Sequence, residues 1–493
     1  MIPIYTIQQT LVITGIALSC ILDGFIFGQM SGMLEALRRS DTSISVTPDD
    51  LSWMAASINI TCFCGFGIVA LITELFGRKK AVSIGTIPLI LSWILTYFST
   101  HRTTLYISRI FAGISFGCTL FLNYINIGEY VSPHIRFMTT NMLLCVTSLT
   151  GTMIGQVLSL VMEWRNVALI GVIPSILSAV IPFFWVESPM WLASQGRFEE
   201  CEVAFNTLRT PSKAAEEELK LLLTMENSKN KKYKKKTFLP VPLKKIQDAL
   251  KQPYFWKCTI LSFIMHVYKV VAGRMLFNTL AISILQDITG GGSAKILYYT
   301  LVTNSFSVFG ASISFIFLKN FKMRQLLIPT GIIANFLLIT FGLVLYLVPD
   351  KNDYINWIKI MLLASYLVIV AVGPYPVLEA MLTEINPLEI KTFNIVLMGI
   401  LAGIVNFLAI KLAPSMFLVI GHHGVFFLNA FIAFMCLAYF WFFLPETKGR
   451  TLQEIELYFK TNSFDSSKLE EDQTRELINV TKERNIQNLT DVM

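Results

Sequence analysis

Charged residues are scarce in this chain. Asp, Glu, Lys and Arg together make up 15% of its 493 residues, whereas apolar residues make up 54%. A composition so poor in charge and so rich in apolar side chains excludes an ordinary soluble domain and indicates a protein with several membrane spans. The net charge of +7 is then mainly a matter of membrane orientation, and we expect no nucleic-acid partner.

Residues that carry catalytic or metal chemistry are also few. The five histidines and eight cysteines are scattered, without paired metal-ligand spacing, and no nucleophile and base can be assembled from motif spacing. We therefore expect no metal, no cofactor, no disulfide and no enzymatic activity. The chain also starts without a basic region or a clear small-residue cleavage site, so residues 10–32 are expected to stay as a span.

Long apolar windows are what the sequence does have. A bilayer core about 30 Å thick needs roughly 20 apolar residues in helical form. Twelve such windows occur, as continuous apolar runs without the period-two alternation of a barrel strand. We predict an all-α membrane protein with twelve transmembrane helices. The windows lie near 10–32, 52–73, 81–99, 104–127, 138–160, 167–186, 257–285, 295–318, 326–348, 357–382, 393–416 and 425–444.

The windows divide into two sets of six. An acid, a proline and a cation seven residues beyond the acid recur after the fourth and tenth windows, from Glu129 to Arg136 and from Glu384 to Lys391. This repetition is typical of transporters whose two halves rock around a site at the bilayer midplane. The predicted parts are an N-terminal six-helix bundle (1–186), a linker with short helices (187–256), a C-terminal six-helix bundle (257–444) and a tail (445–493).

Local signals predict two further features. Ser188 followed by Pro189 suits the start of a short helix that Gly196 can end, and Thr451 with Glu454 has the spacing of a capping box. Small residues four apart predict close packing of the fourth and fifth spans. These pairs are Gly113 with Gly117 and Gly151 with Gly155.

Basic residues indicate the orientation. They gather in the links 78–80, 231–236 and 319–324, which lie on the same side of the predicted bundle. The positive-inside rule places these links and both termini in the cytoplasm, and we expect the protein in the cell membrane. The lysines of 231–236 are then either a solvated linker or a contact with anionic membrane lipids.

Several motifs resemble those of the sugar porters of the major facilitator superfamily. The run Pro445–Arg450 directly follows the last window, and Glu74–Lys79 resembles the family's acidic and basic loop between two spans. Ser52–Ser57 is similar to the insect branch that includes facilitated trehalose transporters. The resemblance covers roughly residues 15–460. It implies two six-helix bundles that move a hexose or a trehalose-like disaccharide by facilitated diffusion and alternating access.

The resemblance also implies a gate of charged residues on the cytoplasmic side. Acids and cations there pair across the two bundles when the transporter faces outward and separate when it faces inward. Lys319, where the family has an acid, and Met190, where it has an arginine, depart from the pattern, and each matching residue can also be an ordinary interfacial charge. The matching positions are Arg78, Glu129, Arg136, Glu187, Glu384, Lys391 and Glu446.

A sugar site needs amide and hydroxyl side chains and an aromatic face. The resemblance implies a site amide at Gln156 and places Ser307 at a second amide position, but Lys269 and Val270 stand where the family has two glutamines. It also implies a hinge in the tenth span, at Gly373, Pro374 and Pro376. The full set of substrate-binding candidates is Gln29, Gln156, Tyr268, Lys269, Asn278, Asn304, Ser307, Glu379 and Asn406.

Three charges fall inside apolar windows, where each costs roughly 2.5–3.5 kcal/mol. We expect Glu379 to pair with Lys269 or with Arg274. These two cations are five residues apart, about 140° around a helix, so one acid cannot easily serve both. Arg274 can alternatively extend to a membrane interface.

The first span bears on proton coupling. Met30 stands where a proton-coupled relative carries an acid, which favours facilitated diffusion, and Asp23 has either a packing role or a coupling role. Three functions stay open at this point. They are uniport of a sugar, transport of a different and possibly anionic solute, and sugar sensing without transport.

Overall fold

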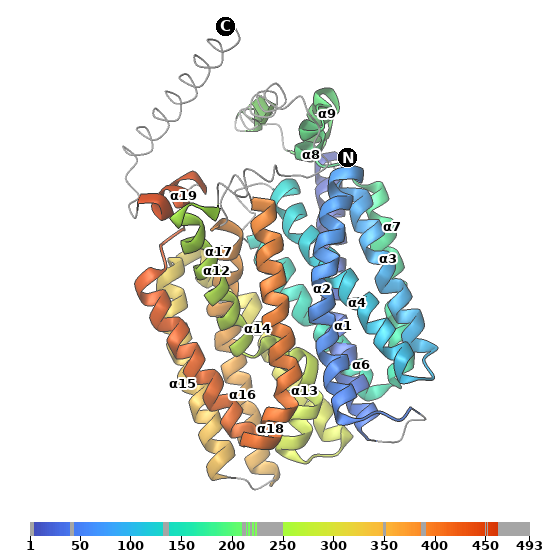
Figure 1. Cartoon of the computed structure of the whole chain (residues 1–493), viewed down its shortest axis with the longest axis vertical. Coiled ribbons are helices and arrows are strands. Elements are labelled where there is room, and N and C mark those ends of the chain that lie inside the picture. Colours follow the sequence, from blue (N-terminus) through green and yellow to red (C-terminus); the bar gives the residue numbers. More distant parts are fainter. Residues whose placement is uncertain are drawn as a thin grey trace, which may run out of the picture.

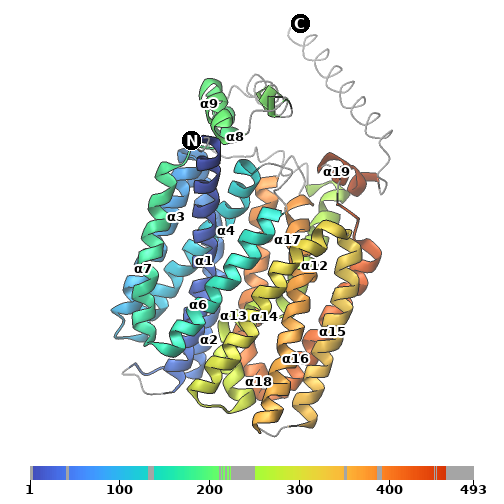
Figure 2. The same cartoon turned by 180° about the vertical axis from the view of Figure 1, so that it is seen from behind.

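The structure is a computed structural model of the chain, and the part that it describes is helical (Figure 1). In both views the blue-to-green helices of the first half lie beside the yellow-to-red helices of the second half (Figures 1 and 2). The described residues are 4–39, 44–131, 138–209, 213, 215–216, 219–220, 222–223, 250–348, 352–385, 391–448, 450 and 452–461.

The first half supplies six spans. The fifth starts with a π-helical stretch, η1, that continues into α6, and the sixth ends with a 3₁₀ turn, η2. The elements are α1 (Ile4–Arg38), α2 (Pro48–Phe76), α3 (Arg78–Tyr97), α4 (Arg102–Tyr130), η1 (Asn141–Thr147), α6 (Ser148–Val161), α7 (Trp164–Val180) and η2 (Ile181–Phe184).

Two short helices, α8 (Pro189–Ser194) and α9 (Phe198–Leu208), then precede the second half. Two of the later spans are interrupted by a glycine, Gly273 between α12 and α13 and Gly373 between α16 and α17. The elements are α12 (Pro253–Val271), α13 (Arg274–Thr289), α14 (Ser293–Asn320), α15 (Met323–Leu347), α16 (Asp353–Val372), α17 (Pro374–Glu384), α18 (Lys391–Phe443) and α19 (Leu452–Thr461).

The span count agrees with the sequence. Eleven helical segments of the described residues are long and apolar enough to cross a membrane, and the last of them corresponds to the 53-residue α18. Gly421 inside α18 has φ 70° and ψ 169°, which is not helical, so α18 is two helices joined at this glycine. Only glycine adopts such a backbone readily. The two parts match the two final windows, and twelve spans result.

The predicted start of α8 is confirmed. The hydroxyl of Ser188 accepts a hydrogen bond from the Trp191 N–H, and Pro189 takes the first helical position. Gly196 beyond the helix has a positive φ of 77°. The short helix expected after the last span is α19.

The bundle has two ends, which we name by their contents. The linker face is the end at which α1 begins and at which α8, α9 and α19 lie (Figure 1). The far face is the opposite end, at which α2 and α16 begin.

Glycines set the closest helix contacts, as predicted for the fourth and fifth spans. A Cβ on Gly151 would lie 2.0 Å from the Ile21 carbonyl oxygen of α1, and one on Gly117 would lie 2.1 Å from the Cys62 carbonyl oxygen of α2. The partner glycine on α1, Gly24, is equally tight, since its Cβ would lie 1.9 Å from the Ser148 carbonyl oxygen. Backbones this close exclude any side chain.

Gly24→Ala therefore should destabilise the protein, by about 1–3 kcal/mol, because α1 and α6 must separate to admit the methyl group. A drop in the melting temperature of the purified protein measures this. The matched control is Gly67→Ala, also within a span, where a Cβ meets nothing within 4 Å. An equal loss in both variants would show that the cost is not one of packing.

Candidate functional site

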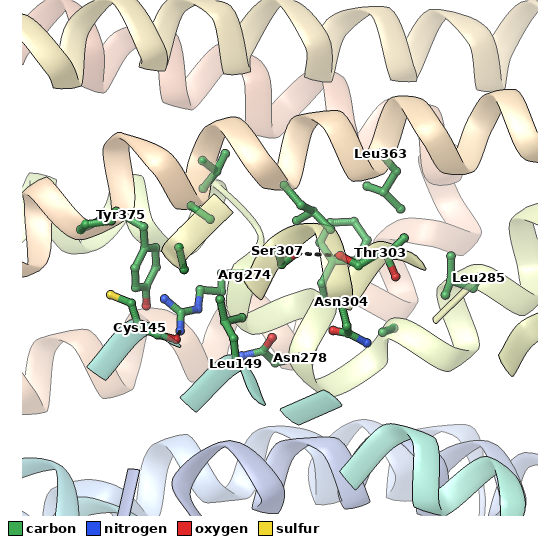
Figure 3. A pocket seen from close by; sticks show the side chains of 17 residues that line it. Cys145, Leu149, Arg274, Asn278, Leu285, Thr303, Asn304, Ser307, Leu363 and Tyr375 are labelled. Atoms are coloured by element: carbon green, nitrogen blue, oxygen red, sulfur yellow. Dashed lines mark hydrogen bonds between the residues drawn. The ribbon is translucent and has the colours of Figure 1, made fainter. Parts of the chain in front are cut away.

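A small cavity lies between the halves, midway along the bundle (Figure 3). Its wall comes from η1 and α6 of the first half and from α13, α14, α16 and α17 of the second. The volume is about 40 Å³, which holds a few water molecules and is far below the roughly 300–1,000 Å³ of small-molecule pockets. The halves therefore leave little free space between them at this point. Its polar lining consists of Cys145, Arg274, Asn278, Thr303, Asn304, Ser307 and Tyr375.

Three amide residues meet beside the cavity and join the halves. The Gln156 amide donates to the backbone carbonyl oxygen of Asn278 at 3.1 Å, and its own oxygen accepts from the Asn304 side-chain amide at 2.7 Å. The side chains of Asn278 and Asn304, which are both among the predicted substrate-binding candidates, line the cavity (Figure 3). Ser307 also lines it, and its hydroxyl donates to the Thr303 carbonyl oxygen at 2.9 Å within the same helix.

The predicted ion pair is made by Lys269. Its Nζ lies 2.6 Å from Oε1 of Glu379, and Oε2 of Glu379 accepts a hydrogen bond of 2.6 Å from the Tyr124 hydroxyl. Glu379 is 8% exposed and Lys269 is 12% exposed, so the pair is shielded from water and both carboxylate oxygens have a partner. Tyr124 belongs to α4, and the contact therefore crosses from the first half to the second.

Arg274 faces the cavity rather than a membrane interface. Its guanidinium lies 4.0 Å from the centre of the Tyr375 ring and donates to the Cys145 carbonyl oxygen at 3.3 Å (Figure 3). Lys269 approaches the same ring to 4.9 Å. Both cations of the seventh span therefore contact the Tyr375 ring.

Three predicted candidates lie away from this cavity. Gln29 is fully buried in the first half, where it accepts a hydrogen bond of 3.3 Å from Arg109. Tyr268 is buried against Phe440 of α18. The Asn406 amide donates to the carbonyl oxygen one turn earlier in its own helix, at 3.0 Å. Their assignment to a substrate site stays a prediction.

Sequence reasoning missed three residues of the site. Thr303 lies one helical turn before Ser307, so helical spacing could have indicated it. Tyr375 lies within the hinge motif, and Tyr124 is a polar residue in the fourth window. Each of the three had a recognisable signal, but nothing in the sequence distinguished it from a residue that only packs against neighbouring helices.

At the linker face, three predicted gate residues form one cluster within the first half. Arg78 Nη2 lies 2.8 Å from Glu129 Oε1. Glu187 accepts the backbone N–H of Arg78 at 2.8 Å, at the start of α3, and Ser188 donates its hydroxyl to Glu129. The carboxylate of Glu187 therefore lies at the positive end of the α3 helix dipole and accepts one of its free N–H groups.

The second half repeats this arrangement with different residues. Glu446 accepts the backbone N–H groups of Met323 and Arg324 at 3.0 and 3.1 Å, at the start of α15. Lys448 donates to three carbonyl oxygens at the end of α14, among them that of Lys319 at 2.7 Å. The two acidic turns thus occupy equivalent places.

The structure says less about the remaining predicted gate residues, Glu384, Arg136 and Lys391. Glu384 is the last residue of α17 and is half-buried. Arg136 and the side chain of Lys391 lie outside the described residues. Pairing across the halves at the linker face stays a prediction.

At the far face, ion pairs that the sequence did not predict join the halves. Arg38 at the end of α1 lies 2.6 Å from Asp287 of α13. Lys411 of α18 pairs with Asp49 of α2, donates to Ser52 at 2.8 Å and lies over the Trp53 ring at 4.7 Å. The far face is therefore held together by polar contacts between the halves.

Two sets of six spans around a small, partly polar cavity define a multi-pass membrane protein of the major facilitator fold. A family model described as "Sugar (and other) transporter" matches residues 9–459. The chain belongs to this family, which is a family of transporters rather than of enzymes.

Similar proteins agree with this. The facilitated trehalose transporter Tret1 of Aedes aegypti is 23% identical over 92% of this chain, and that of Polypedilum vanderplanki is 24% identical over 92%. The chain spans 55% of the former protein and 88% of the latter. Among solved structures, the proton:xylose symporter XylE bound to 6-bromo-6-deoxy-D-glucose has a TM-score of 0.75 and 17% identity, over 92% of this chain and 99% of that one. The last comparison supports the fold.

Neutralising the buried ion pair should test its geometry. Glu379→Gln leaves Lys269 and Arg274 as two uncompensated cations and should cost about 3–5 kcal/mol of stability. Lys269→Gln should cost less, since Glu379 stays near Arg274, and the double variant should recover part of the loss of Glu379→Gln. Melting temperatures of the purified variants measure this.

An exposed ion pair supplies the matched control. Lys295 and Asp353 lie 2.6 Å apart with side chains 51% and 66% exposed, and neutralising both should cost about 0–1 kcal/mol. A double variant at 269 and 379 that is no more stable than Glu379→Gln alone would contradict the pairing.

Proposed function

We propose that this protein carries a sugar, a hexose or a trehalose-like disaccharide, across the cell membrane by facilitated diffusion. The observation that carries the proposal is the position of Gln156, Asn278 and Asn304, three amide residues that lie between the two halves in or beside a small cavity. Amide and hydroxyl groups in this position can exchange hydrogen bonds with sugar hydroxyls. The names of the similar trehalose and xylose transporters support the same solute class.

Alternating access requires that contacts between the halves break and form again. Contacts of this kind include the Gln156–Asn304 hydrogen bond, the Tyr124–Glu379 hydrogen bond and the Arg38–Asp287 ion pair. Each contributes on the order of 1 kcal/mol net. Thermal motion can therefore break the contacts at one face while new contacts form at the other. When the halves part, the Gln156 amide exchanges its protein partners for the solute.

The spans that line the cavity contain the joints for this motion. Gly273 has φ 76° and separates α12 from α13, and Gly373 precedes Pro374 where α16 gives way to α17. Such breaks allow one half of a span to tilt against the other. We propose Gly373, Pro374 and Pro376 as the hinge, and the division of the chain at 187–256 as the boundary between the moving halves.

Facilitated diffusion rather than proton coupling fits the first span. Met30 is fully buried and cannot carry a proton. Asp23 accepts hydrogen bonds from Thr119 at 2.6 Å and from Asn123 at 3.3 Å, both on α4. These contacts within the first half support a packing role for Asp23.

Uptake of labelled glucose and trehalose by oocytes that express the protein tests the proposal. We expect saturable uptake that does not change with the proton gradient. We also expect a loss of at least tenfold in Gln156→Ala, because that change removes the donor and the acceptor of the Gln156 amide from the site. Gln325→Ala, an exposed amide at the linker face, is the matched control. Absence of uptake despite verified surface expression would favour a sensor.

The proposed orientation places the linker face in the cytoplasm. It is supported by the basic residues of 78–80 and 319–324, which lie at the linker face. Asn479 and Asn488 start glycosylation motifs in the tail, outside the described residues. We expect no change in gel mobility after treatment with a glycosidase, whereas a shift that disappears in Asn479→Gln or Asn488→Gln would place the tail outside the cell.

A further inference from the structure

The charges around the central cavity do not balance. Lys269 and Arg274 are cations, and Glu379 is the carboxylate within reach of them. Two cations and one anion leave one positive charge. Among the described residues that line the cavity, Arg274 is the charged one.

The contacts of Arg274 do not neutralise it. A carbonyl oxygen at 3.3 Å and an aromatic face at 4.0 Å are its described partners, whereas a guanidinium offers five N–H donors. Glu379 cannot supply the missing charge without cost, because its two oxygens hold Lys269 and Tyr124. If Glu379 turned to Arg274, Lys269 would be the unpaired cation instead. The excess of one positive charge remains in either case.

Two helices begin at the same place, each directly after the first part of its own interrupted span. Arg274 is the first residue of α13, and Tyr375, whose ring it contacts, is the second residue of α17. The first turn of a helix presents N–H groups without intrahelical partners. In transporters, the ends of such interrupted helices face anionic groups of the substrate.

The rest of the cavity suits a hydroxylated body. Asn278, Asn304 and Ser307 line it from α13 and α14, and Leu149 and Leu363 supply an apolar wall (Figure 3). A solute with a carboxylate at one end and several hydroxyl groups would satisfy both parts. Its carboxylate could pair with the guanidinium through two parallel hydrogen bonds.

We infer that the preferred solute is a polyhydroxylated monocarboxylate, a sugar acid of the hexuronate or aldonate class. This inference rests on the proposed transport function and names its substrate class. A neutral sugar leaves the buried cation of the cavity uncompensated, so the site binds it more weakly.

The test compares labelled glucuronate with labelled glucose in voltage-clamped oocytes that express the full chain. Uniport of a monoanion moves one negative charge per molecule, so the charge measured as current should equal one elementary charge per labelled glucuronate taken up. The kcat/KM of glucuronate uptake should exceed that of glucose uptake at least tenfold. Arg274→Gln should lower the ratio of glucuronate to glucose kcat/KM at least tenfold, because it removes the cation that pairs with the carboxylate. Arg274→Lys should retain part of the glucuronate uptake.

Lys295→Gln, a loss of one positive charge at the exposed far face, is the control and should leave the preference unchanged. Glucose uptake that excess glucuronate does not inhibit, without a glucuronate current, would overturn the inference and leave the proposed function standing. Absence of uptake for both solutes, with no change in the melting temperature of the purified protein by either, would overturn both.

Discussion

The absence of water from the bilayer core is the constraint on which the rest of this structure depends. Backbone groups there must pair within the chain, and the described spans are accordingly helical. The same constraint acts on side chains. Arg109, Gln29 and Asp23 are all nearly or fully buried and bonded inside the first half, and Lys269 and Glu379 are bonded inside the second. Polar chemistry is confined to the interior of the halves and to the seam between them.

The contacts between the two halves determine how the protein can move. Gln156 with Asn304 and Tyr124 with Glu379 are single contacts of ordinary strength, set at mid-depth, while Arg38 with Asp287 closes the far face. By contrast, Glu187 and Glu446 hold the starts of α3 and α15 within their own halves. Strong local anchoring inside each half and modest contacts between halves are the properties that rigid-body motion needs.

The fold could be predicted from the sequence because span number depends on apolar length alone, and the twelve windows needed no tertiary information. The site could be predicted in part. Charges at 269, 274 and 379 were evident because they interrupt apolar runs, and Gln156 was evident from the family resemblance. Gln29, Tyr268 and Asn406 were not distinguishable, because the rotation of a buried helix is set by its neighbours. Nothing in the sequence places one polar face toward the cavity and another toward a packed helix.

The positive charge that Arg274 holds at mid-depth has an electrical consequence. It lies within the transmembrane field, where one full charge crossing 100 mV corresponds to about 2.3 kcal/mol. An empty carrier then rearranges with a net charge in its centre, whereas a carrier loaded with a monoanion rearranges as a neutral body. Membrane voltage would therefore act on the return of the empty protein. The rate of this step would depend on the resting potential of the cell.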